Sequence, residues 1–367
     1  MDYRIIETAE LTGDDDPRRW IHEASNHLWH DEIVAVHGND DLTRPLDAEL
    51  RLSVANPERR LVVWAALPTG ADDGADNVVG IGRLVLPLLD NTHYCEARVV
   101  VRPDARGQGI GSALAETILN RARAEGRRVL VTSTGSVPPT STSDADAVEV
   151  GEQLGFIDGT HPAARFLLGR GFRPEQLELH SVLDLPVDSE GVARLHDEAI
   201  AYADDYDLIS FEGTCPDEHI DGFADLAVAM STDMPHAEID VEAQAWDAAR
   251  IRHQERRQMA AGIRALTVVA QHLPSGRLVG YTTLLHDAAH PEAANQEDTL
   301  VLHEHRGHRL GMLLKVLNLR RAQQVWPSVE RIHTWNAREN DPMLAINFAL
   351  GFRVVGTEAA WQRRLDG

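Results

Sequence analysis

A glycine-rich turn at residues 106–111, Arg-Gly-Gln-Gly-Ile-Gly, constrains this chain more than any other feature. A β-branched stretch at residues 97–102 precedes it and ends at Pro103, and Leu114, Ile118 and Ala122 follow it at helical spacing. The turn is therefore expected to join a strand to a helix. Glycines let the backbone approach an anion closely, and the helix N-terminus adds N–H donors and a favourable field. The sequence predicts a phosphate site here.

The pattern returns in the second half of the chain with an offset of 200 residues (306 − 106). An apolar stretch at 299–302 leads into His-Arg-Gly-His-Arg-Leu-Gly at 305–311, and residues 312–326 then have helical periodicity. Each turn is followed by a further local echo ending in Gly-Phe, at 164–172 and at 345–352. The chain therefore contains two related units.

The two turns differ from two other phosphate-binding motifs. A dinucleotide-binding fingerprint needs Gly-x-Gly-x-x-Gly early in a βαβ unit, whereas here arginine comes first and the turn falls late in each half. Neither turn continues into Gly-Lys-Ser/Thr, which excludes a P-loop.

Arg-x-x-Gly-x-Gly followed by an amphipathic helix, a strand and a short helix ending in Gly-Phe resembles the GNAT superfamily of N-acetyltransferases. The resemblance covers roughly the last half of each repeat. It implies an α/β fold class with a mixed α+β sheet, built as two GNAT-type acyl-CoA N-acyltransferase domains in tandem. An extended, polar segment near residue 185 places the expected boundary, giving an N-terminal domain at 1–185 and a C-terminal domain at 186–367.

The resemblance also implies that acetyl-CoA, or another short acyl-CoA, is the co-substrate held by both turns. In the first half, the expected cofactor-binding residues are Val101, Arg106, Gly107, Gln108, Gly109, Ile110, Gly111 and Ser112. In the second half, they are Val301, Arg306, Gly307, His308, Arg309, Leu310, Gly311, Asn336 and Asn340.

Acyl transfer needs a base that removes a proton from the amine, and in the family this is often a carboxylate on the strand before the phosphate turn. Glu297 and Asp298 precede the second turn in this way, and a pair of solvated turn residues is the alternative of about equal weight. In the first half the nearest carboxylate is Glu96, while Arg98 matches Asp298. Backbone N–H groups of the same strand can serve as oxyanion donors in the family.

The family commonly has a tyrosine as general acid four residues before Gly-Phe in the last helix. This chain has Leu167 and Asn347 at those positions, and neither can donate a proton as tyrosine does. Asn340 is expected to cap the last helix of the second half, since Asn-Asp-Pro is a good helix start, and Thr160 is its counterpart in the first half. Trp335 and Asn336 are expected to line the pantetheine slot, with a plain core role as the alternative for Trp335.

The two turns differ where Gly109 becomes Arg309. If this position needs a positive φ, Arg309 is strained and cofactor affinity falls, although its guanidinium could add a phosphate contact. The first half has the cleaner phosphate turn and the second has the better base and cap. We therefore expect catalysis in the second half.

Composition narrows the partners. A net charge of −23 with no lysine-rich patch argues against nucleic acid. An acidic surface could steer a cationic amine, but a role in keeping the protein soluble is the favoured explanation of the charge. No metal site is expected, because His303, His305 and His308 cross a turn without a completing carboxylate or cysteine pattern. No apolar run approaches the ~20 residues of a membrane span, so no membrane partner and a cytoplasmic location are expected. The Ser-, Thr- and Pro-rich residues 135–147 are expected to form a loop.

The resemblance and these features together favour an acyl-CoA-dependent N-acetyltransferase acting on a small-molecule amine, with a cationic amine as one option. Two alternatives stay open: a non-catalytic acyl-CoA sensor or scaffold, and a protein N-acetyltransferase. The sequence leaves the acceptor and the oligomeric state open.

Overall fold

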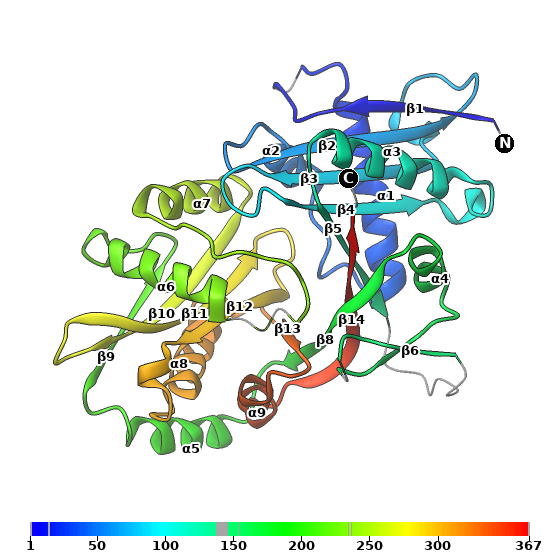
Figure 1. Cartoon of the computed structure of the whole chain (residues 1–367). Coiled ribbons are helices and arrows are strands. Elements are labelled where there is room, and N and C mark those ends of the chain that lie inside the picture. Colours follow the sequence, from blue (N-terminus) through cyan, green and yellow to red (C-terminus); the bar gives the residue numbers. More distant parts are fainter. Residues whose placement is uncertain are drawn as a thin grey trace. The chain divides into compact units, whose positions relative to one another are not determined.

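The computed structural model describes residues 2–13, 15–136, 146–152, 154–233, 235 and 237–365. The chain folds into two compact units, each made of strands and helices (Figure 1). The first unit comprises Met1–Leu177, His236–Glu242 and Thr357–Gly367, and the second comprises Glu178–Pro235 and Ala243–Gly356. Most of the loop expected at 135–147 lies outside the described residues.

The compact units differ from the expected halves 1–185 and 186–367 at the two long strands β8 (Arg173–Asp184) and β14 (Arg353–Arg364). In the second unit, residues 178–184 of β8 pair antiparallel with β13 (Arg331–Ala337). In the first unit, residues 357–364 of β14 pair antiparallel with β5 (Val129–Ser136). Residues 178–184 of the first half therefore lie in the second unit, and residues 357–364 of the second half lie in the first unit. The halves 1–185 and 186–367 stay a prediction about the sequence repeat.

The sheet of the first unit has the order β1-β2-β3-β4-β5-β14 and is antiparallel except between β4 and β5. Its other strands are β1 (Tyr3–Thr8), β2 (Arg59–Pro68), β3 (Gly80–Pro87) and β4 (Tyr94–Val101). Its helices are α1 (Arg19–His37), α2 (Leu46–Leu52), α3 (Ile110–Ala124) and α4 (Pro162–Leu168), and a hairpin is formed by β6 (Ala147–Glu149) and β7 (Phe156–Asp158).

Helices cover both faces of this sheet because its central strands are apolar on both sides. On β2, Val62 and Trp64 belong to the core cluster that includes Leu114 of α3. The alternate residue Val63 belongs to a second cluster, which includes Ile21 of α1. This period-2 division gives a helix–sheet–helix sandwich.

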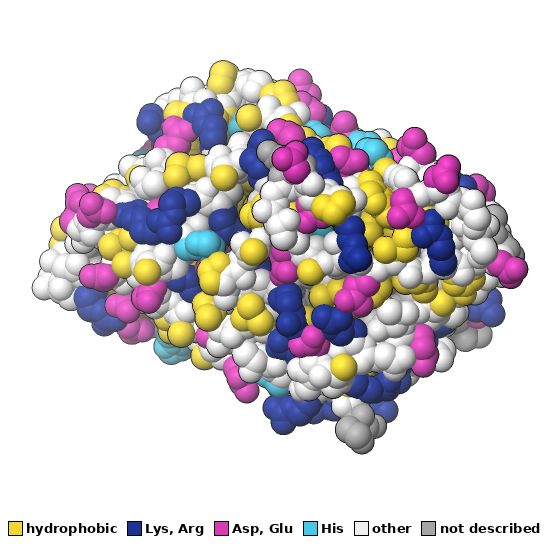
Figure 2. Space-filling view, turned by 90° about the horizontal axis from the view of Figure 1, so that it is seen from above, with side chains coloured by type: hydrophobic (Ala, Val, Ile, Leu, Met, Phe, Trp, Pro, Cys, Tyr) yellow, Lys and Arg dark blue, Asp and Glu magenta, His cyan; other side chains and the backbone are white. Residues whose placement is uncertain are grey.

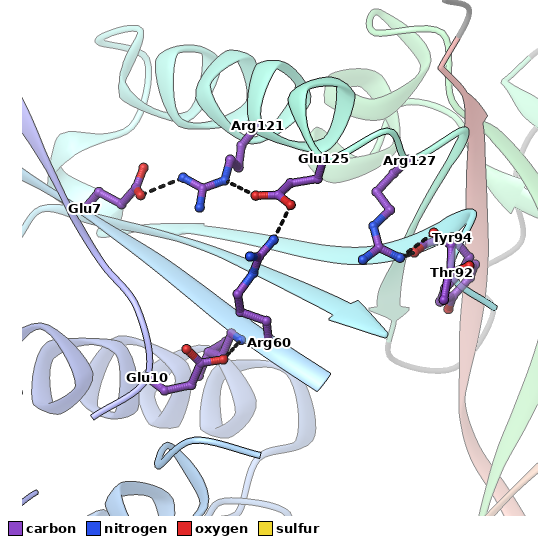
Figure 3. Close-up of polar contacts among 9 residues, drawn as sticks. Glu7, Glu10, Arg60, Thr92, Tyr94, Arg121, Glu125 and Arg127 are labelled. Carbon is purple, nitrogen blue, oxygen red and sulfur yellow. Dashed lines mark hydrogen bonds and ion pairs between the residues drawn. The ribbon is translucent and has the colours of Figure 1, made fainter. Parts of the chain in front are cut away.

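A chain of ion pairs holds the C-terminal end of α3 to the sheet (Figure 3). Arg121 lies 2.7 Å from Glu7 of β1 and 2.8 Å from Glu125. Glu125 in turn pairs with Arg60 of β2. The network ties the helix that begins at the glycine turn to two strands of the sheet.

The sheet of the second unit has the order β8-β13-β12-β11-β10-β9, antiparallel except between β12 and β13. Its other strands are β9 (Tyr206–Glu212), β10 (Ile263–His272), β11 (Arg277–Asp287) and β12 (Ala293–Val301). Its helices are α5 (Ser189–Ile200), α6 (Ile220–Asp233), α7 (Ala248–Ala260), α8 (Leu310–Val325) and α9 (Asp341–Leu350). From β9 to β14, the order of helices and strands is the one expected from the sequence.

Helix α5 was not predicted from the sequence. Asp188 caps it by accepting a hydrogen bond from the backbone N–H of Glu190, and Ala199 belongs to the core cluster that includes Leu313 of α8. Because α8 contacts α5 on one side and the sheet on the other, it is buried around most of its circumference. This burial determines the environment of the polar residues on α8.

Candidate active site

Both glycine turns form the strand–turn–helix junction expected from the sequence. Each strand is followed by a short 3₁₀ turn, Pro103–Ala105 or His303–His305, and then by α3 or α8. Gly107 and Gly307 have left-handed φ values of +75° and +86°. Among the described residues, no side chain caps the N-terminus of either helix, which leaves these N–H donors for an anion.

The two arginines of the motif shape their turns. Nε of Arg106 donates to the carbonyl of Val101 at 2.9 Å, and Nε of Arg306 donates to the carbonyl of Val301 at 3.0 Å. Nη2 of Arg106 pairs with Glu32 at 3.0 Å, and Nη2 of Arg306 pairs with Asp233, the last residue of α6, at 2.8 Å. Both arginines thus tie the end of the strand to the start of the turn.

Gly109 and Arg309 both lie in the left-handed region, with φ of +85° and +53°. This position therefore needs a positive φ, a question that the sequence alone left open. The Arg309 guanidinium turns toward α5, where Nη1 lies 3.0 Å from Glu198 and the group lies 5.3 Å from the Tyr202 ring. Its contribution at the phosphate site is therefore expected to come from the backbone.

The other residues of the turns fill structural positions. Ile110 and Leu310 are buried. A Cβ on Gly111 would lie 3.4 Å from the side chain of Phe166 in α4, and a Cβ on Gly311 would lie 3.1 Å from that of Ile346 in α9. The side chain of Gln108 donates to the carbonyl of Asp104 at 3.4 Å, and the ring of His308 lies 5.6 Å from that of Tyr206.

Arg170 is a cation beside the first turn that the sequence analysis missed. Its Nη2 donates to the hydroxyl of Ser112 at 2.6 Å, and its guanidinium lies 3.6 Å from the centroid of the Phe166 ring. The motif Gly-Arg-Gly-Phe contained this arginine, but only the fold brings it to the start of α3.

An opening lies between the two parallel strands of each unit. In the first unit only residues 94–96 of β4 pair with β5, and in the second only residues 293–295 of β12 pair with β13. Beyond these positions the parallel strands no longer pair with each other. Their backbone N–H and C=O groups on the facing edges therefore have no partner in this ladder. Such an edge can hydrogen bond to an extended ligand that carries amides.

Glu297 and Asp298 form a β-bulge in β12. Thr282 pairs with Thr299 and Leu284 pairs with Gln296, so these two carboxylates lie opposite one residue of β11. Thr299 and Gln296 both reach the Thr282 hydroxyl, at 2.7 and 3.0 Å, and therefore share a face of the sheet. The two carboxylates between them point toward the opposite face, which breaks the strand's alternation.

The side chain of Gln296 supports the bulge from within the sheet. Its Nε2 lies 2.9 Å from the carbonyl of Thr283 and 3.1 Å from that of Glu297, and the residue is buried. It thereby satisfies carbonyls at the point where the bulge interrupts the strand ladder. The sequence analysis did not single out Gln296, because its role depends on the pairing register.

The two carboxylates have different surroundings. Tyr281 donates to Oδ2 of Asp298 at 3.0 Å, and the Tyr281 ring lies edge-on to Phe223 of α6. Desolvation raises the pKa of Asp298, and the bond from Tyr281 opposes that rise. Desolvation around the carboxyl group, with a smaller contribution from the charge of Asp298, raises the pKa of Glu297 to about 7, while the residue as a whole keeps an exposed surface. An accessible carboxylate that titrates near neutrality suits a general base.

The first unit has no such bulge at the matching position. The pairing of β3 with β4 is regular throughout, and Arg83 pairs with Arg98 where the second unit has Thr283 opposite both carboxylates. Arg98 lies over the Trp29 ring at 4.7 Å. Glu96 is exposed and accepts a hydrogen bond of 3.0 Å from Tyr94. The first unit therefore presents a cation where the second presents two acids.

The polar residues after β13 form a connected chain. Asn340 caps α9 by accepting from the backbone N–H of Met343 at 3.3 Å, as expected. Nδ2 of Asn347 donates to Oδ1 of Asn336 at 2.6 Å, and Lys315 of α8 donates to Oδ1 of Asn347 at 2.7 Å. Leu167, the counterpart of Asn347, is part of an apolar core cluster. Lys315 was also missed by the sequence analysis.

Thr160 and Trp335 were also expected to take part in the two sites. Thr160 is not the cap of α4, because His161 holds that position and Thr160 instead bonds to Asp158. Trp335 is half-buried and stacks on His180 of β8 with ring centroids 4.3 Å apart.

The histidines of the second turn make contacts with aromatic rings. His305 shares a hydrogen bond of 3.0 Å with the hydroxyl of Tyr206, and its ring lies 4.8 Å from that of His272. These contacts give His305 a packing role at the start of β9.

The charge distribution on the surface concerns nucleic acid as a partner, and the length and polarity of the helices concern the membrane. On the face seen in Figure 2, basic and acidic side chains are interleaved, without the continuous basic stripe that follows a phosphate backbone. Within the part of the chain that the structure describes, no helix has the length and apolar character needed to cross a membrane.

Known proteins resemble this chain in sequence and in fold. Residues 12–156 match the family model described as Acetyltransferase (GNAT) family. A tandem GNAT protein from the clavulanic acid biosynthesis pathway, solved without AcCoA, is similar over 100% of this chain and 99% of its own, with 24% identity and a TM-score of 0.72. A comparison with curated protein sequences finds no match.

Two further solved structures share the fold. A GCN5-related N-acetyltransferase from Sphaerobacter thermophilus has 12% identity and a TM-score of 0.60, over 99% of this chain and 96% of its own. A GCN5-related glucosamine N-acetyltransferase region of a fungal multi-domain β-N-acetylglucosaminidase has 15% identity and a TM-score of 0.59, over 99% of this chain and 38% of its own.

Proposed function

Residues 12–156 match the GNAT acetyltransferase family model, and the whole chain shares the fold of a tandem GNAT protein. We propose that this protein transfers an acetyl or short acyl group from acyl-CoA to a small-molecule amine, with catalysis in the second unit. The observation that carries the proposal is the bulge of β12, where Glu297 and Asp298 lie side by side on one face. The regular first unit has Arg98 at that place.

Glu297 is the proposed general base. It is accessible, and its pKa of about 7 lets it accept a proton near neutral pH, directly or through a water molecule. Asp298, held by Tyr281, is the proposed positioning group, and its charge helps to keep the pKa of its neighbour high. Backbone N–H groups at the bulge are the proposed donors to the oxyanion.

Acyl-CoA is proposed to bind with its pyrophosphate at a glycine turn and its pantetheine along the opening between the parallel strands. Free N–H groups at the start of α3 and α8 support the first part, and the short pairing of β4 with β5 and of β12 with β13 supports the second. The first unit is proposed to bind the cofactor or to act as a scaffold.

The proposed acceptor is a cationic small-molecule amine. Two carboxylates on one face of the second unit, in a chain with a net charge of −23, favour a positively charged partner. An ammonium nitrogen has no lone pair, so the cationic amine would first release one proton to water. The neutral nitrogen would then attack the thioester carbonyl and lose a second proton to Glu297.

A non-catalytic acyl-CoA sensor is the second candidate, favoured by Leu167 and Asn347 at the positions where the family commonly has tyrosine. Release of free thiol from acetyl-CoA, followed with a panel of amines and with mass spectrometry of the products, separates the two. Thiol release that depends on the amine, together with an acetylated product, supports the enzyme. Saturable binding of acetyl-CoA without product for any amine contradicts it and supports the sensor.

A further inference from the structure

Lys315 is a buried cation in the interior of the second unit. It is 3% exposed, and its Nζ contacts Asn347 at 2.7 Å and the sulfur of Met343 at 3.8 Å, with the ring of Phe352 at 5.6 Å. None of these neighbours is ionisable. Among the described residues, no carboxylate forms an ion pair with Lys315, and burial alone lowers its pKa to about 7.

An unpaired buried lysine is costly, and an apolar residue could take its place. The first unit shows that alternative on the same framework. Its matching residues are Ala115 on α3 and Leu167 on α4, and Phe172 N–H bonds to the Leu167 carbonyl as Phe352 N–H bonds to that of Asn347. The fold itself therefore does not require a cation between these helices.

The lysine is connected to the end of β13 by amide groups. Its ammonium donates to Oδ1 of Asn347, and Nδ2 of Asn347 donates to Oδ1 of Asn336. Asn336 lies beyond residues 331–333, the part of β13 that pairs with β12. The chain thus runs from a buried charge to the opening between the parallel strands of the second unit.

We propose that Lys315 is a positioning residue whose charge, acting through Asn347, stabilises the thiolate that leaves in the second unit. This inference rests on the function proposed above. In the transfer, the C–N bond forms as the C–S bond breaks, and sulfur departs with the bonding electron pair. The amine proton goes to Glu297, and the thiolate takes a proton from water. An ammonium bonded to Oδ1 polarises the buried Asn347 amide. The bond from Nδ2 of Asn347 to Oδ1 of half-buried Asn336 carries this polarisation to the opening, where it makes the N–H groups of Asn336 better donors to sulfur.

Lys315→Met tests the proposal, because methionine keeps the length of the side chain and removes the charge. Met343→Leu is the matched control, since it alters the same packing and leaves the Lys315–Asn347 bond. We expect the methionine variant to lose about 10- to 100-fold in kcat, with the Kd for acetyl-CoA little changed and the control close to wild type. Equal kcat values for wild type and Lys315→Met would overturn the proposal.

A second measurement does not depend on turnover. The thiolate of CoA absorbs ultraviolet light, so the thiol of CoA bound to the full-length protein can be titrated. We expect Lys315→Met to raise the pKa of this thiol relative to wild type, with Met343→Leu unchanged. A thiol pKa that does not differ between wild type and Lys315→Met would overturn the proposal even if kcat falls.

The two measurements distinguish this inference from the proposed function. If wild type binds CoA but acetylates no amine, while the thiol pKa differs as expected, the acyltransferase proposal fails and the charge at the thiol site stands. If CoA does not bind at all, both fail. If Asn347→Leu combined with Lys315→Ala, the pair found in the first unit, folds and retains wild-type kcat, only the role of Lys315 is refuted.

Discussion

Tyr281 donates a 3.0 Å hydrogen bond to Asp298, and this bond separates the roles of the two carboxylates in the bulge of β12. The bonded residue is held on the sheet beside α6. Its neighbour Glu297 is left accessible, with a pKa of about 7. One bulge thus provides a fixed charge and a titrating group in consecutive positions.

The pH dependence of turnover follows from Glu297. A base must be deprotonated to act, so kcat should rise with pH as Glu297 loses its proton near pH 7. Lys315 loses its charge at higher pH, so wild-type kcat should then fall again, whereas Lys315→Met should show the rise alone. A pH profile of kcat at saturating acetyl-CoA and amine measures this rise. If the rise occurs instead near pH 4, an ordinary solvated carboxylate is the base.

Tyr281→Phe should move that rise to lower pH. The hydroxyl lowers the pKa of Asp298, so its removal favours the neutral acid there, and Glu297 then loses the charge that helps to raise its own pKa. Asp298→Asn should shift the profile in the same direction. Profiles of both variants that coincide with wild type would show that the two carboxylates do not interact.

Gln296→Leu should destabilise the second unit by about 1–3 kcal/mol, because the carbonyls of Thr283 and Glu297 lose their donor inside the sheet. It should also lower kcat, since the bulge is no longer supported. Urea unfolding and turnover measure the two effects. Gln271→Ala, at a half-buried glutamine of β10 whose side-chain hydrogen bond to Gly276 is exposed, is the control and should change neither.

The residues at the left-handed position of the two turns, Gly109 and Arg309, can be substituted for each other. Gly109→Arg should destabilise the first unit by about 1–2 kcal/mol, because a side chain is forced to φ near +85°. Arg309→Gly relieves that conformation but loses the contacts with Glu198 and Tyr202, so its net effect should be smaller. Thermal unfolding of both variants tests this, and equal destabilisation by the two changes would contradict it.

Lys315 should make the stability of the second unit depend on pH. Its pKa is about 7 when folded and near its ordinary value of 10.5 when unfolded, so between these values the unfolded chain binds more protons. The free energy of unfolding should therefore rise as pH increases from about 7 to about 10. Lys315→Met should lack this rise in denaturant titrations, and an identical rise in the variant would place the titration elsewhere.

Local sequence signals predicted the parts of the site that depend on local structure. The glycine turns, the helices that follow them and the Asn340 cap are determined by residues adjacent in the chain, and the structure has all three. The order of strands and helices from β9 to β14 followed from hydrophobic periodicity in the same way.

Features that depend on pairing or packing could not be predicted in this way. Two consecutive acids in β12 were recognised as candidates, but the bulge follows from the register with β11 and from Gln296. Lys315 follows Leu313 and Leu314, and its burial results from α5 and α9 packing around α8. The exchange of segments of β8 and β14 depends on which strand edge each one meets.

The location of catalysis is tested most directly by comparing kcat of Glu297→Gln and Glu96→Gln with wild type, under saturating acetyl-CoA and amine. The account predicts that the change at Glu297 lowers kcat by about 100-fold or more, with acetyl-CoA still bound, and that the change at Glu96 leaves it near the wild-type value. Wild-type kcat for Glu297→Gln, or a comparable loss for Glu96→Gln, would contradict it.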